Sequence, residues 1–175
     1  MQSKRTLCSA LIQCYFDYAW YSGIDKKLQL RLQVTQNKVV RFILNLGPRT
    51  SISCEILDSL GMLRVDDRAT QLRLNHVFNI FHGNAPNYLC DKFILNKNNT
   101  RGATNNNYVI PKIKGKESSC FYYNAIKDWN TLPLDTKQLS SKQSLKKTCK
   151  VVFSQQGKGS FMMPYPVLLI LILLN

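Results

Sequence analysis

The strongest constraint on the fold is one long amphipathic segment, residues 25–46. Its apolar side chains recur at helical spacing, and Gly47 and Pro48 follow in the order that ends a helix. A helix of this length must bury one face, because an isolated helix is only marginally stable in water. The residues assigned to that face are Leu28, Leu32, Thr35, Val39, Phe42, Ile43 and Leu46.

Helical spacing predicts further helices on both sides of this segment. In the first, residues 5–22, we expect Leu7, Leu11, Tyr15 and other apolar residues to be buried. Asp66 or Asp67 is expected to cap a helix that ends near His82 and buries His76 among its apolar neighbours. We therefore predict a mainly α-helical, bundle-like domain of five to six helices, which cover residues 5–22, 25–46, 53–60, 66–82, 118–130 and 140–153.

The predicted domain covers residues 1–156 and contains one long loop. Residues 96–107 are rich in Asn, which is typical of an exposed loop. Residues 157–175 form an apolar tail that we do not expect to belong to the domain, and 167–174 are too few to span a bilayer. The tail could pack on the domain or stay exposed. No secretory signal is recognisable, so we expect an intracellular protein, nuclear or cytoplasmic.

Charge separates the chain into three parts. The 24 Lys and Arg residues outnumber the 10 Asp and Glu residues, which gives a net charge of +14. Most of the excess lies in residues 1–50 and 96–160, on either side of a nearly neutral middle. This pattern favours contact with a polyanion, most plausibly nucleic acid, over a merely solvated lysine-rich surface.

The enzyme and metal-site motifs are missing. The six cysteines are scattered without zinc-site spacing, and the two histidines lie on different faces of a predicted helix. There is no phosphate-binding glycine loop and no nucleophile elbow. Asp66 and Asp67 are adjacent, as are magnesium ligands in polymerases, but a flanking Arg on each side and a following helix favour a helix start. We expect no metal, cofactor or small-molecule substrate.

Several short motifs occur in one order along residues 7–153. The chain resembles, in these motifs, the C-terminal part of the reverse transcriptase of non-LTR (LINE-type) retrotransposons, downstream of the catalytic palm. Met62 stands where the family has Trp. The matching segments are 10–19 (ALIQCYFDYA), 32–43 (LQVTQNKVVRFI), 60–68 (LGMLRVDDR), 85–89 (APNYL), 99–101 (NTR), 109–111 (VIP) and 129–133 (WNTLP).

The resemblance implies a helical, thumb-like region that holds RNA or an RNA–DNA duplex. The palm and its catalytic carboxylates are missing, so the chain should not polymerise nucleic acid. Phosphate contacts by Lys and Arg supply most non-specific affinity. The basic residues predicted to make these contacts are Lys26, Lys27, Arg31, Lys38, Arg41, Arg101, Lys112, Lys114, Lys116, Lys146, Lys147 and Lys150.

Three aromatic residues are candidates either for base stacking or for the core. Tyr108 or Tyr122 could stack on a base, although an aromatic ring in a helix more often belongs to the core. Trp129 shares an apolar stripe with Ile126 and Leu132, which predicts a core position. Two alternatives to nucleic-acid binding stay open: a relic of a mobile element without function, and a small membrane-associated basic protein.

Overall fold

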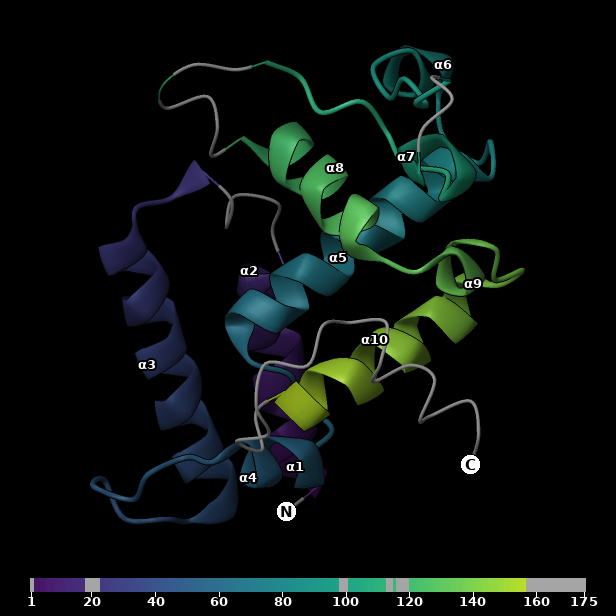
Figure 1. Cartoon of the computed structure of the whole chain (residues 1–175). Helices are drawn as coiled ribbons and strands as arrows, with labels where there is room; N and C mark the ends of the chain where they lie inside the picture. Colours follow the sequence, from purple (N-terminus) through teal and green to yellow (C-terminus); the bar gives the residue numbers. More distant parts are fainter. Residues whose placement is uncertain (1, 18–22, 98–100, 113–114, 116–119, 157–175) are drawn as a thin grey trace.

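The computed structural model describes residues 2–17, 23–97, 101–112, 115 and 120–156, and is mainly helical there (Figure 1). The expected mainly α-helical fold is therefore confirmed. The apolar tail, 157–175, lies outside the described residues. The helical elements are α1 (Gln2–Cys8), the π-helical turn η1 (Ser9–Gln13), α2 (Cys14–Phe16), α3 (Lys26–Leu44), α4 (Cys54–Ser59), α5 (Val65–Phe81), α6 (Asn87–Cys90), α7 (Arg101–Thr104), α8 (Phe121–Thr131), α9 (Leu134–Lys137) and α10 (Lys142–Gln156).

Helix α5 is the centre of the molecule. It packs against α8 on one side and α10 on the other, and α3 stands beside its N-terminal half (Figure 1). An ion pair between Arg73 Nε and Asp128 Oδ2, 2.6 Å apart, joins α5 to α8. Burial raises the pKa of Asp128, and the charge of Arg73 opposes that rise. The ion pair therefore compensates part of the cost of burying this carboxylate.

The ends of α3 and α5 differ from the sequence predictions. α3 ends before Asn45, which adopts the left-handed conformation (φ 54°) two residues ahead of the predicted Gly47. Asn tolerates this conformation better than most residues. α5 begins at Val65, so Asp66 and Asp67 lie in its first turn and neither is the N-cap. They still favour the helix by their charge, because the N-terminus carries a partial positive charge.

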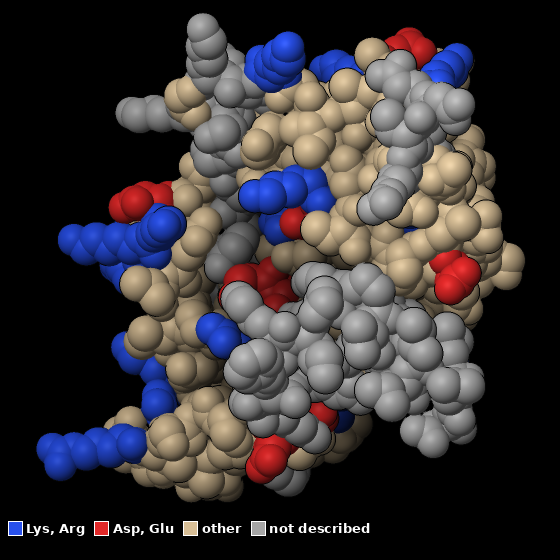
Figure 2. Space-filling view, viewed as in Figure 1, with Lys and Arg blue, Asp and Glu red and all other residues tan. Residues whose placement is uncertain are grey.

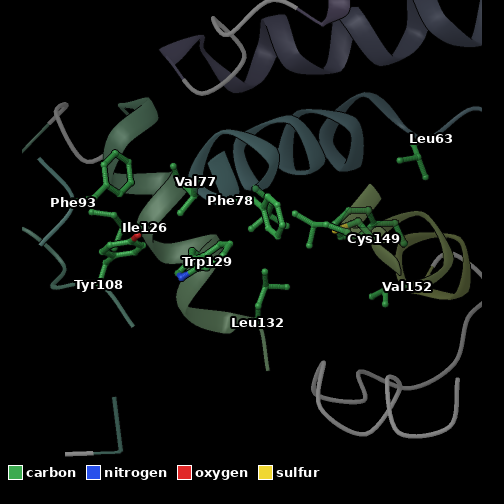
Figure 3. Close-up of a cluster of buried hydrophobic side chains, with 14 residues drawn as sticks. Leu63, Val77, Phe78, Phe93, Tyr108, Ile126, Trp129, Leu132, Cys149 and Val152 are labelled. Atoms are coloured by element: carbon green, nitrogen blue, oxygen red, sulfur yellow. The ribbon is translucent and has the colours of Figure 1, made fainter. Parts of the chain in front are cut away.

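The larger core, here called the C-terminal cluster, joins α5, α8 and α10 (Figure 3). Trp129 is fully buried, as predicted, and lies between Tyr108 and Leu132. Aromatic rings meet here edge to face or tilted, an arrangement that adds to the gain from burial. The buried members of the C-terminal cluster are Leu63, Leu74, Val77, Phe78, Phe93, Tyr108, Ala125, Ile126, Trp129, Leu132, Leu145, Cys149, Val152 and Phe153.

The smaller core, here called the N-terminal cluster, joins α1, α3 and α4. It differs from the prediction, because the side chains of Leu7, Leu11 and Tyr15 are 55%, 60% and 74% exposed. On α3, Leu28 and Phe42 are also exposed, so the buried face is turned from the predicted stripe toward Gln36 and Val40. The buried members are Cys8, Val39, Val40, Ile43, Leu57, Leu60 and Met62.

The buried face of α5 also differs from the expected one. His76, predicted to point inward, is exposed, while its neighbour Asn75 is buried. Burial and the charge of Lys142 nevertheless lower the pKa of His76. Ala69 and Val77, also predicted to point inward, are buried, and burial extends to Leu74 and Phe78 because α5 packs against both α8 and α10.

Two glutamines of α3 connect the two clusters. Gln36 is buried and its Nε2 donates to the carbonyl oxygen of Leu63 at 2.7 Å. The backbone N–H of Val65 donates to Gln33 Oε1 at 3.1 Å, which satisfies an unpaired donor at the start of α5. The segment between the two clusters is thus fixed by side-chain hydrogen bonds to its backbone.

A second connection runs from α2 through α5 to α10. Arg68 donates to both carboxylate oxygens of Asp17, at 2.8 and 2.9 Å, and to Gln71 Oε1 at 2.8 Å. Gln71 Nε2 in turn donates to the carbonyl oxygen of Lys146 at 3.0 Å. The hydrogen bond to Asp17 raises the pKa of Arg68. This bidentate geometry is the strong form of a carboxylate–guanidinium contact.

The second half of the Asn-rich loop is held against the C-terminal cluster. Trp129 Nε1 donates to the carbonyl oxygen of Asn106 at 3.2 Å. The Asn130 amide accepts from the N–H of Tyr108 and donates to its carbonyl oxygen, both at 2.8 Å, as a neighbouring strand would. Residues 105–108 are therefore anchored, although the composition predicted an exposed loop.

Lys137 also holds this part of the loop in place. Its side chain is fully buried, and its Nζ donates to the carbonyl oxygen of Asn105 at 2.9 Å and to Asn107 Oδ1. It also lies 5.9 Å from the centre of the Trp129 ring. Burial lowers the pKa of Lys137 to about 8, since the two oxygens that accept its hydrogen bonds are neutral and do not offset the lost hydration.

Candidate nucleic-acid interface

The solvent-facing side of α3 carries a row of cations. Lys27, Arg31 and Lys38 are four and seven residues apart, which places them on one stripe, and all three are exposed. Figure 2 shows Lys and Arg side chains projecting along the α3 side of the molecule. Within the part of the chain that the structure describes, none of the three forms an ion pair. We call these three residues the α3 basic stripe.

Two other predicted α3 residues lie apart from this stripe. Lys26 is exposed but borders a hollow of about 280 Å³ that also contains Arg64 and Asp66. Arg41 is half-buried, and its Nε donates to the carbonyl oxygen of Thr50 at 2.8 Å. Arg41 therefore helps to fix the turn after α3 and presents less of its charge to solvent.

Helix α10 presents a second basic face. Lys146 and Lys147 are exposed, and Lys150 is half-buried beside the turn at Gly61. A Cβ at Gly61 would lie 3.1 Å from Arg5 Nη2 and 3.4 Å from Lys150 Nζ, so these two cations converge there. The exposed Lys142 extends the α10 row and was missed, although its spacing of four residues from Lys146 was a usable signal.

The loop cations are only partly described. Lys112 is exposed. The side chain of Arg101 and the whole of Lys114 and Lys116 lie outside the described residues. The structure therefore brings together Lys27, Arg31 and Lys38 on α3 and, separately, the predicted residues of α10.

The two tyrosines considered for base stacking belong to the protein core. Tyr108 is 4% exposed and contacts Phe93 edge to face, and burial raises its pKa to about 12. Tyr122 is half-buried, packs on Phe93 and donates its hydroxyl to the carbonyl oxygen of Lys92. Both rings are engaged within the fold, so neither offers a free face of the kind that stacks on a base.

The adjacent aspartates behave as parts of a helix start. Asp66 lies 3.6 Å from Arg64 in an exposed ion pair. The pKa of Asp67 is raised to about 6, chiefly by burial and then by the negative charge of Asp66. The described residues contain no group of three or more His, Cys, Asp or Glu side chains placed to hold a metal ion.

Comparisons with known proteins place no further constraint on this surface. No protein-family model, curated protein or solved structure matches the chain. Among the described helices, none combines the length and the apolar character needed to cross a membrane.

Proposed function

We propose that this chain is a non-catalytic fragment of a non-LTR retrotransposon reverse transcriptase, downstream of its palm, that binds RNA or RNA–DNA duplex through phosphate contacts. The motif residues that suggested this origin lie at contacts between elements. Gln33 and Gln36 bind the segment before α5, and Asp17 binds Arg68. The Trp129–Asn130 pair binds the loop at Tyr108. A shared set of motifs is expected at such positions, because each contact needs a particular side chain.

The observation that carries the binding proposal is that all charged side chains of α3 and α10 are positive. Neither helix contains an Asp or Glu, although α3 carries five cations and α10 carries four. Carboxylates would neutralise these cations, as Asp17 and Asp128 do for Arg68 and Arg73 of α5. A helix face with cations alone attracts phosphate groups and releases their counterions on binding.

The binding should be independent of base sequence. Lysine and arginine contacts to phosphate fix position and register without reading the bases. Tyr108 and Tyr122, the two tyrosines predicted as stacking candidates, are buried and half-buried, so these two rings add little base stacking. With three phosphates neutralised by the α3 basic stripe, the logarithm of the binding constant should fall with the logarithm of salt concentration with a slope of about −2 to −3.

A matched pair of charge-reversal variants tests the proposal. The first is Lys27→Glu/Arg31→Glu/Lys38→Glu, which reverses the α3 basic stripe. The second, Lys92→Glu/Lys97→Glu/Lys127→Glu, changes the net charge equally at exposed positions elsewhere. Fluorescence anisotropy with a labelled RNA duplex, repeated at several salt concentrations, gives both the affinity and the salt slope.

We expect the α3 variant to lose at least about tenfold in affinity and the part of the salt slope that the α3 basic stripe contributes, and the control variant to lose much less. Equal losses would show that only overall charge matters and would overturn the assignment to α3. Absence of salt-dependent binding by the unaltered chain would favour the relic without function.

A further inference from the structure

An apolar groove runs between the N-terminal helical segment and α3. It encloses about 330 Å³ and is open to solvent along its length. Its apolar residues belong to the N-terminal cluster or flank it. The lining side chains are Leu7, Cys8, Leu11, Ile12, Lys38, Val39 and Phe42.

The side chains bordering this groove are unusually exposed for their size. Leu7, Leu11 and Phe42 are 55%, 60% and 56% exposed. Tyr15, one helical turn beyond Leu11, is 74% exposed and continues the row along α2. Isolated exposed apolar residues are common, but a contiguous row along a groove is typical of an interaction site.

The helix that forms one wall is locally irregular. The π-helical turn η1, Ser9–Gln13, interrupts the α-helix between Cys8 and Cys14. A π-helical turn contains more residues than an α-helical turn, which changes the direction of the side chains that follow. Leu11 and Ile12, which are adjacent in this turn, both border the groove. Such turns cost stability relative to a regular helix and occur frequently at functional sites.

The charges around the groove have one sign. Lys38 forms part of the wall. Lys4 lies near one end, where its Nζ is 5.0 Å from the centre of the Phe42 ring and donates to Asn45 Oδ1 at 2.7 Å. Among the described residues lining the groove none is acidic, in contrast with the hollow at Lys26, which contains Asp66.

We propose that this groove binds an amphipathic helix of a partner protein that carries acidic residues beside its apolar face. Apolar residues of the partner at positions i, i+4 and i+7 would cover Leu7, Leu11 and Phe42, as in other helix-in-groove complexes. Its Asp or Glu residues would lie beside Lys4 and Lys38. The row of exposed apolar residues from Leu7, in the groove wall, to Tyr15, beyond it, spans about 12 Å at 1.5 Å per residue, enough for two turns of a bound helix.

Charge argues against the other occupants. A second copy would bring its own Lys4 and Lys38 toward the same groove, and each copy carries a net charge of +14. A nucleic acid would place phosphates against an apolar floor that offers them few donors. An acidic amphipathic helix satisfies both the apolar floor and the cationic rim.

The test uses the full chain and two fluorescein-labelled synthetic helices of about 15 residues, a length at which a helix can form on binding. Both peptides have Leu at i, i+4 and i+7. One carries Glu at the flanking positions and the other carries Lys there. The chain variants are Leu11→Asp in the groove and Ile94→Asp, an equally exposed apolar position elsewhere (62% exposed).

We expect the Glu peptide to bind at least about tenfold more tightly than the Lys peptide, as measured by fluorescence anisotropy. Leu11→Asp should remove this binding and Ile94→Asp should not. Leu11→Asp should also keep the helical circular dichroism spectrum and most of the affinity for RNA, because Lys38 is the one residue of the α3 basic stripe that lines the groove.

Two results would overturn the proposal. Equal binding of the two peptides, or equal loss in both chain variants, would remove the claimed charge complementarity or the claimed location. Dimerisation of the unaltered chain in light scattering, abolished by Leu11→Asp, would assign the groove to a second copy.

Discussion

The two hydrophobic clusters of this chain are built from different side chains. The C-terminal cluster contains buried rings, among them Phe78, Phe93, Tyr108 and Trp129, which contact other rings edge to face or tilted. In the N-terminal cluster, as far as the structure describes it, the buried members are aliphatic or sulfur-containing. Large rings close the space between α5, α8 and α10, whereas the smaller side chains leave the groove beside α3 open.

The two clusters cover their apolar side chains to different degrees. The C-terminal cluster covers its own rings and anchors a loop over them. The N-terminal cluster buries one face of α3 and leaves Leu7, Leu11 and Phe42 in solvent. We therefore expect the C-terminal cluster to dominate the free energy of unfolding and the N-terminal part to open first.

The largest expected change in stability comes from the removal of the Trp129 side chain. Trp129→Ala should lower the free energy of unfolding by about 3–5 kcal/mol, because the fully buried ring leaves a large cavity. Ile43→Ala is the matched change in the N-terminal cluster and should cost about 2–4 kcal/mol. Urea unfolding followed by circular dichroism measures both. A larger loss for Ile43→Ala would reverse the ranking of the two clusters.

A smaller effect is expected at the connection between the clusters. Gln36→Leu removes the donor to the buried carbonyl of Leu63 and should cost about 1–3 kcal/mol. Thr35→Ala, at an exposed neighbouring position on α3, is the control. Native-state hydrogen exchange should show that Gln36→Leu exposes amides of α3 while those of α8 stay protected. Uniform loss of protection would mean that the clusters unfold as one unit.

The smallest expected effect concerns the buried charge in the C-terminal cluster. The pKa of Lys137 is lowered to about 8 in the folded state. Between pH 8 and 10.5 the unfolded chain therefore binds more protons than the folded chain, so the contribution of Lys137 to stability should rise with pH. The difference between the unaltered chain and Lys137→Met, by urea unfolding at each pH, isolates this contribution from Tyr108 and Cys149. A difference that is flat or falls with pH would contradict it.

Local sequence patterns predicted the longer helices well and their contacts poorly. Periodicity and capping residues placed α3, α5, α8 and α10 within a few residues, because these signals are local. The buried positions of α8, including Ile126 and Trp129, were also correct. On α3 the predicted stripe was correct at Val39 and Ile43 but missed Gln36, which is buried with a hydrogen bond to Leu63 that no local pattern encodes.

The candidate site was predictable where it depends on charge alone. Lys27, Arg31 and Lys38 were expected at the surface and are exposed. Lys137 was not singled out, because a lysine in a polar segment has no local signal of burial. The groove beside α3 was missed for the opposite reason: periodicity assigned Leu7 and Leu11 to the core, but it carries no information on whether another element covers them.

Because Lys137 is buried, its chemical reactivity can report how often the loop over it opens. An acylating reagent attacks only an uncharged amine that it can reach. Exposed lysines should therefore react without any prior opening of the structure. Lys137 Nζ can be modified only when residues 105–108 lift away from it. The ratio of its acylation rate to that of an exposed lysine therefore measures how often this loop opens, with no probe added to the chain.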